Sequence, residues 1–206
     1  HYTLKDKSTA ISICMIDVQG KFLVAAPKLP DWRFQKSVIY MWKHDVAGAN
    51  GIIINKKCQH PNFRHVCMEG NVKIKDNIDA PVYYGGPVLT NVVGVLHSVD
   101  TMLASSNRLQ NQDVAFTLDR KMLEMVANGT GPKQKIITLG MSQWEQGQLE
   151  AEMEAAPPRP ASMSWLVLDY DPKIIFGPQT EDLWEMCVSR AVRNKTKEIT
   201  SKIFKG

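Results

Sequence analysis

Residues 20–27 read GKFLVAAP, and residues 37–42 read SVIYMW. Each stretch is an apolar run of strand length bounded by glycine, proline or polar residues, a pattern typical of a buried β-strand. A third apolar run, Ile52–Ile54, follows a polar loop that ends at Asn50-Gly51. We therefore expect the second and third runs to pair as a hairpin around a glycine-containing loop, with a β-sheet at the centre of the fold.

The rest of the chain alternates strand patterns with helical patterns. The strand patterns cover residues 82–84, 92–96, 114–116, 135–139 and 164–168, and the helical patterns cover 62–66, 117–128, 144–153 and a last helix from about Thr180. In the second helical pattern we expect Thr117 to cap the helix, with Asp119 in its first turn. Its apolar residues predict one core-facing stripe: Leu118, Met122, Met125 and Val126. Interleaved strands and helices without a long linker predict a single α/β or α+β domain.

Composition places the chain among ordinary globular proteins. Of its 206 residues, 44% are hydrophobic and 22% are charged, and no apolar run approaches the roughly 18 residues of a membrane-spanning helix. The four cysteines, Cys14, Cys58, Cys67 and Cys187, are too scattered for a disulfide framework, which favours a reducing compartment. We expect a soluble, intracellular protein. Because the first residue is His1 rather than methionine, a targeting segment that preceded it and was removed is a second interpretation.

Positive charge gathers at the end of the chain. The net charge is +4, yet residues 189–206 hold six basic residues against the single acid Glu198, which leaves the remainder close to neutral. These basic residues are Arg190, Arg193, Lys195, Lys197, Lys202 and Lys205. We divide the chain into an N-terminal segment (1–19, with a candidate edge strand at 9–18), a domain (20–190) and a basic tail (191–206). The tail predicts contact with nucleic acid, an anionic surface or a partner's groove, and its simplest interpretation is a solvated helix face.

Several motifs occur in an order that resembles the AlgH/YqgE-like family. They are GKFLVAAP (20–27), FQKSVIY (34–40), GANGIIIN (48–55), GGPV (85–88), LHS (96–98), LG (139–140), WEQGQLE (144–150) and SW (164–165). The resemblance covers about residues 20–190. It implies a mixed β-sheet folded into a pseudo-barrel with flanking helices, in proteins sometimes labelled transcriptional regulators. It implies neither an enzyme activity nor catalytic residues. Lys57, the proline-rich loop at 155–161 and the basic tail depart from the family pattern.

The turn Gly85-Gly86-Pro87 is the first candidate binding element. Glycine-rich turns that follow a strand can present backbone N–H groups to an anion. Pro87 has no N–H, however, and no phosphate-loop motif accompanies the turn. A tight turn that needs glycine for its backbone conformation is the favoured interpretation.

The second candidate is the cluster of Trp144, Gly147, Gln148 and Glu150. A carboxylate beside an amide and an indole could bind a polar ligand or act as a general base. The alternative, which we favour, is an acidic helix face in solvent, with Trp144 anchoring the helix to the sheet. On a helix, Gln148 and Glu152 would share one face, and Glu150 and Glu154 would share another.

Two further patterns suggest chemistry. His97-Ser98 at a strand end invites a hydrolase hypothesis, but the nucleophile motif G-x-S-x-G is missing, and a lone histidine is usually a structural hydrogen bonder. The second pattern offers thiol and imidazole ligands to zinc: Cys58, His60, His65 and Cys67. Their spacing matches no familiar zinc motif, so we favour a polar loop with two ordinary thiols and expect no cofactor.

These patterns lead to three functional hypotheses. The first is a non-enzymatic regulatory or ligand- and partner-binding module that uses the surface near Gly86, His97, Trp144 and Glu150. The second is a nucleic-acid-associated protein that uses the basic tail. The third is a hydrolase or a metal-dependent enzyme.

Overall fold

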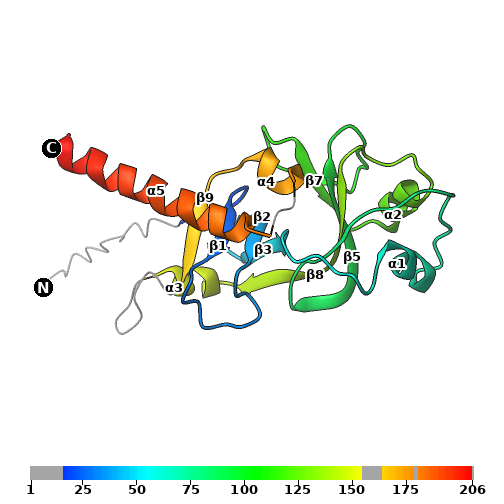
Figure 1. Ribbon diagram of the computed structural model, residues 1–206, viewed down its shortest axis with the longest axis horizontal. Coiled ribbons are helices and arrows are strands. Elements are labelled where there is room, and N and C mark those ends of the chain that lie inside the picture. The colour runs from blue at the N-terminus through cyan, green and yellow to red at the C-terminus, as the bar shows by residue number, and fades with distance from the viewer. Residues whose placement is uncertain (1–15, 155–163, 179–180, 206) are drawn as a thin grey trace, which may run out of the picture.

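The computed structural model describes residues 16–154, 164–178 and 181–205. In chain order these residues form β1 (Phe22–Ala25), β2 (Val38–Asp45), β3 (Gly48–Ile53), α1 (Phe63–Glu69), β4 (Val82–Tyr84), β5 (Val88–Ser98), β6 (Asn107–Arg108), β7 (Val114–Thr117), α2 (Arg120–Ala127), β8 (Lys135–Glu145), α3 (Gln148–Met153), β9 (Trp165–Leu168), α4 (Pro172–Phe176) and α5 (Leu183–Phe204). Figure 1 shows α1 and α2 at one end of the sheet and α3 and α5 at the other.

The long strand β8 joins the two halves of the sheet. Its first residues, from Lys135 to Met141, pair with β5, and its last residues, from Ser142 to Glu145, pair with β3. The strand order is β6-β7-β5-β8-β3-β2-β1-β9, and β4 pairs with β8 in parallel. Because this order ends in two different strands, the sheet is not closed. The mixed sheet with flanking helices is thus confirmed, as an open pseudo-barrel.

The alternation of side chains along β1 and β2 divides the apolar residues between two clusters. Phe22 and Tyr40 belong to the cluster that α4 and α5 cover, and Leu23 and Ile39 belong to the cluster that includes residues of α3. All four residues of β1 are buried, as its sequence predicts. A third cluster packs α1 and α2 against β5 and β8.

The hairpin of β2 and β3 is confirmed, with one difference in its loop. The two strands pair from Ile39 and Ile53 as far as Asp45 and Gly48. The Asn50-Gly51 pair, expected in the loop, therefore lies within β3. Gly51 is needed there because a Cβ at this position would lie 2.6 Å from Ile39 Cγ2 and from Met41 Sδ.

The helix that follows β7 starts later than the sequence predicts. Thr117 is the last residue of β7, and Asp119 is the cap, since its side chain accepts a hydrogen bond from Lys121 N. This later start changes which residues of the predicted apolar stripe face the core. Met122 and Val126 are buried as expected, whereas Leu118 lies outside the helix and is 41% exposed.

The expected helix over 144–153 is wrong in its first part. β8 continues to Glu145 because its end pairs with β3, and α3 begins only at Gln148. Gly147 separates the two elements with a left-handed conformation (φ 74°) that glycine adopts without strain.

The last helix, α5, is 22 residues long and starts at Leu183 rather than near Thr180. The expected boundary between domain and tail, at 190/191, lies inside this helix, and Ala191 is still buried. Beyond Ala191 every side chain through Lys205 is exposed, and this segment projects from the body (Figure 1).

Residues 1–15 and the proline-rich loop lie outside the described residues, and no strand forms at Ile16–Val18. None of the helices in the described ranges is long and apolar enough to cross a bilayer.

Candidate functional site

The turn Gly85-Gly86-Pro87 packs against β8. Gly85 N–H donates to Leu139 O at 2.8 Å, and Gly85 O accepts from Ile53 N and Ser142 Oγ. A Cβ on Gly86 would lie 2.2 Å from the carbonyl carbon of Met141. The glycines therefore allow two backbones to approach closely, and the backbone of Gly85 is used within the fold.

His97 is fully buried, and the fold occupies both of its ring nitrogens. Nδ1 lies 2.8 Å from Ser98 O, and Nε2 lies 2.7 Å from Thr117 Oγ1. Because a carbonyl only accepts, Nδ1 carries the proton of a neutral ring, and burial lowers the pKa of His97 in agreement with this state. The Ser98 hydroxyl instead bonds Asp100. No Ser–His pair of the hydrolase type forms here.

Trp144 and Glu150 lie far from His97. His97 pairs with Lys135 at the start of β8, and Trp144 follows nine residues later in that strand, on the order of 30 Å away at the usual strand rise. The residues that the sequence suggested as one surface therefore do not converge. Trp144 belongs to the apolar cluster of α3, with an exposed fraction of 5%.

The carboxylates of α3 bind the body of the protein, which corrects the expected solvated face. Glu150 Oε1 lies 2.6 Å from His44 Nε2, and His44 Nδ1 accepts from Val18 N. His44 is thus a neutral ring that donates to Glu150, with no free nitrogen left for catalysis. Gln148 Oε1 accepts from Glu145 N and covers the end of β8.

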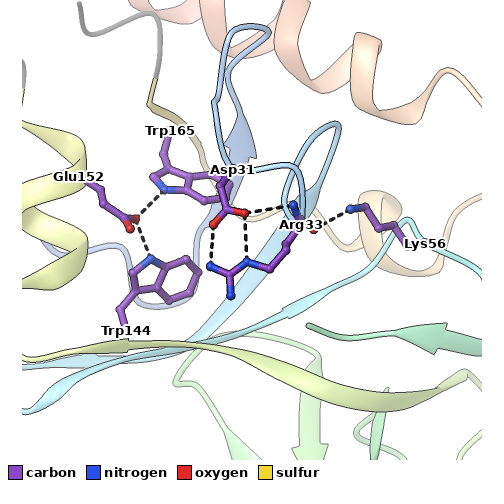
Figure 2. Close-up of polar contacts among 6 residues, drawn as sticks. All are labelled: Asp31, Arg33, Lys56, Trp144, Glu152 and Trp165. Carbon is purple, nitrogen blue, oxygen red and sulfur yellow. Dashed lines mark hydrogen bonds and ion pairs between the residues drawn. The ribbon is translucent and has the colours of Figure 1, made fainter. Parts of the chain in front are cut away.

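Glu152, which the sequence did not single out, joins two tryptophans. Its Oε2 atom accepts from Trp144 Nε1 at 2.8 Å and from Trp165 Nε1 at 3.1 Å (Figure 2). Phe34 stacks on Trp144 and meets Trp165 edge-on. Buried indole N–H groups require an acceptor, and this need is a signal for Glu152 beyond the helix face that it was expected to share with Gln148.

A second polar network lies beside the tryptophans (Figure 2). Arg33 Nη2 donates to Asp31 at 2.8 Å, which lowers the pKa of that carboxyl. Lys56 Nζ donates to Arg33 O, and burial lowers the pKa of Lys56. A hollow of about 200 Å³ opens between Asp31 and Glu152, but it is smaller than most ligand sites.

The four candidate zinc ligands do not surround one point. Cys67 is buried in the cluster of α1 and α2, where burial raises its pKa to about 11. His65 Nδ1 accepts from Asn62 N and completes the cap of α1. Within the ranges that the structure describes, no group of three or more His, Cys, Asp or Glu residues is placed to hold a metal ion.

A larger cavity of about 580 Å³ lies between α1, α2 and the sheet, and we call it the α1–α2 groove. Its floor is apolar and consists of Val93 and Val95 of β5 and Leu139 of β8. Val95 is buried, whereas Val93 and Leu139 are only partly buried, because α1 and α2 pack on either side of them. This volume falls within the range of roughly 300–1,000 Å³ that is usual for ligand sites.

The walls of the α1–α2 groove combine apolar and polar side chains. Leu118 and Leu123 contribute apolar surface from the α2 side, and Arg120 and Asp119 lie beside them. His65 contributes from α1. This groove was not predictable from the sequence, because the helical periodicity places Leu118 in the core and no motif marks a place where two helices only partly cover a sheet.

The basic tail divides into two parts in the structure. Arg190 forms an ion pair with Asp171 at 2.9 Å and therefore belongs to the domain. Lys202 pairs with Glu198 one turn away, and both side chains are exposed. Arg193, Lys195 and Lys197 are exposed on the projecting part of α5.

Comparisons with known proteins agree with this fold. Residues 22–195 match the model of the AlgH-like family. A UPF0301 protein from Bradyrhizobium sp. (strain BTAi1) is 35% identical over 181 residues, which cover 84% of this chain and 81% of the relative. A UPF0301 protein from Pseudoalteromonas translucida is 36% identical over 177 residues, which cover 85% and 91%.

Two solved structures resemble this chain. The solution structure of the AlgH protein from Pseudomonas aeruginosa has a TM-score of 0.67 at 31% identity, over 84% of this chain and 88% of that one. The crystal structure of protein DIP2367 from Corynebacterium diphtheriae has a TM-score of 0.61 at 22% identity, over 82% and 84%, and shows the fold alone. By its sequence match and its relatives, the chain belongs to the AlgH-like family.

Proposed function

We propose that this protein is a non-enzymatic, regulatory binding module and that its binding site is the α1–α2 groove. The observation that carries this proposal is an apolar floor, formed by Val93, Val95 and Leu139, in which α1 and α2 leave Val93 and Leu139 only partly buried. Uncovered apolar surface within a cavity of about 580 Å³ is a usual property of sites that bind a ligand or a partner.

Two buried histidines and three cysteines support binding rather than catalysis. His44 and His97 use both ring nitrogens within the fold, so neither offers a free base. Burial raises the pKa of the Cys58, Cys67 and Cys187 thiols and so disfavours the nucleophilic thiolate. All three are free thiols, which suits a role inside the cell.

A capture experiment with matched variants tests the proposed site. The full chain is immobilised and exposed to extract from its source organism, beside the variants Leu118→Arg and Met68→Arg. Leu118 lines the α1–α2 groove, whereas Met68 is a more exposed apolar residue of α1 that does not line it. We expect a partner that binds the wild type and Met68→Arg but not Leu118→Arg. A partner that Leu118→Arg retains in full would contradict the groove as the site.

A second candidate function is nucleic-acid binding through the projecting part of α5. Arg193, Lys195, Lys197 and Lys202 are exposed there, on a helix that leaves the body of the protein. Replacing all four with alanine should lower the affinity for a 20-base-pair DNA duplex at least about tenfold at low salt and flatten its salt dependence. Fluorescence anisotropy measures both quantities. Unchanged binding by the alanine variant would exclude this function.

A further inference from the structure

Strand β5 extends beyond the end of its neighbour β7. The two strands pair only from Val95 to Ser98 on β5 and from Val114 to Thr117 on β7, whereas β5 begins at Val88. After Thr117 the chain leaves the sheet and enters α2. On this side of β5, no strand of the described residues continues β7 past Val95.

The backbone of Val93 points toward this open edge. Ser98 N donates to Gln134 O at 2.9 Å, so alternation directs the backbone groups of Leu96 and Gly94 toward β8. The N–H and C=O groups of Val95 and Val93 are consequently directed to the opposite side. Val95 has Thr117 as its partner there, and the corresponding position opposite Val93 is open.

The backbone of β8 supports this assignment independently. Leu139, which lies opposite Val93, uses its carbonyl to accept from Gly85 N at 2.8 Å, on the β4 side. Ile137, which lies opposite Val95, likewise donates to Pro81 O on that side. Leu139 is therefore not the hydrogen-bond partner of Val93, and a partly buried donor and acceptor of Val93 stay available at the edge of β5.

This open edge lies inside the α1–α2 groove. Val93 and Val95 form part of its floor, and Thr117 and Leu118, where β7 ends, form part of its wall. The groove thus occupies the position that a continuation of β7 would take. A peptide backbone supplies alternating donors and acceptors that match a strand edge, whereas an apolar small molecule would leave Val93 unpaired.

We propose that the α1–α2 groove binds an extended peptide segment of a partner protein, which adds to the edge of β5 at Val93 in line with β7. This inference rests on the proposed function and names the class of its ligand. The segment places an apolar side chain over Val93, Leu123 and Leu139. It carries few acidic side chains, because Asp119 and Glu69 outnumber Arg120 among the charged residues that line the groove.

A peptide selection provides the probe. A display library of random twelve-residue peptides is selected on the full chain, and the enriched peptides are synthesised and titrated. We expect alternating apolar sequences whose affinity falls at least tenfold with Leu118→Arg and with Thr90→Arg, two exposed positions of the groove. Met68→Arg is the matched control and should bind as the wild type does. Amide spectra of each variant establish that it is folded.

Amide hydrogen exchange then tests the strand pairing itself. In the free protein we expect the Val93 amide to exchange much faster than the Gly94 amide, which bonds β8. Saturating peptide should slow exchange at Val93 at least tenfold. Peptide binding that depends on Leu118 but leaves the Val93 amide unprotected would contradict the proposal that the peptide pairs with β5 as an added strand. The groove would then still be a binding site. A selection without any groove-dependent peptide would overturn the peptide inference, while the capture experiment decides the proposed function separately.

Discussion

Trp144 Nε1 donates a 2.8 Å hydrogen bond to Glu152 Oε2, and this bond ties the end of β8 to α3. The same oxygen accepts from Trp165 of β9, which lies at the opposite end of the strand order from β6. One carboxylate therefore links three separate elements around the apolar cluster that contains Phe34. The arrangement stabilises the half of the sheet that lies away from the α1–α2 groove.

Replacing Glu152 with alanine should destabilise the protein by about 2 kcal/mol or more, because two largely buried indole N–H groups lose their acceptor. Urea unfolding followed by tryptophan fluorescence measures this change. Glu154→Ala removes an exposed carboxylate of the same segment and should change stability by less than about 0.5 kcal/mol. Equal effects of the two substitutions would show that the indole bonds contribute little.

Gly86→Ala should cost more than about 3 kcal/mol, because the new Cβ would overlap the backbone of Met141, which cannot move aside as a side chain can. Gly147→Ala is the control. Its φ of 74° is also unfavourable for alanine, but no atom lies within 4 Å of the new Cβ, so we expect a cost of about 1–2 kcal/mol. Thermal unfolding compares the two variants, and a Gly86→Ala protein as stable as Gly147→Ala would contradict the close approach.

His97 should make the protein less stable in mild acid. Burial lowers its pKa below the ordinary 6.5, so the unfolded chain binds a proton that the folded protein resists. The contribution of the neutral His97 ring to the free energy of unfolding is fully present above about pH 6.5. It is lost as the pH falls below that value toward the lowered pKa of the folded protein. Urea unfolding between pH 8 and pH 5 should show this loss, and His97→Gln should reduce the slope. An identical slope in both proteins would exclude His97 as its source.

Cys67 and Cys187 should resist thiol reagents in the folded protein. Burial raises the pKa of each to about 11, so little thiolate forms at pH 8. In a Cys14→Ser background, a chromogenic disulfide reagent should label the partly exposed Cys58 first and the other two only after unfolding. Rapid labelling of all three in the folded state would contradict the burial of α1 and α5 against the sheet.

Much of the fold follows from local patterns in the sequence. The apolar runs at β1, β2 and β3 predict buried strands because their length and boundaries leave few alternatives. The end of β8 was not predictable in this way, because Trp144 is held in a strand by pairing with Gly48–Gly51 of β3, far away in the sequence. The secondary structure of this segment is therefore determined by its pairing with β3 and not by its own sequence pattern.

The candidate site was less predictable than the fold. Residues that carry reactive groups, such as His97 and Glu150, attract attention in a sequence, yet both are occupied by internal hydrogen bonds. The α1–α2 groove depends on incomplete cover over Val93 and Leu139, which only the packing of two helices determines. No local pattern encodes such a gap.

The most direct test of the account is a methyl spectrum of the full chain recorded while the captured partner is added. We expect the methyl signals of Val93, Leu123 and Leu139 to shift in proportion to binding, with those of Leu23 and Ile39 unchanged. Shifts confined to the methyl signals of Ile199 and Ile203 on the projecting part of α5, with the groove signals unchanged, would contradict the α1–α2 groove as the binding site.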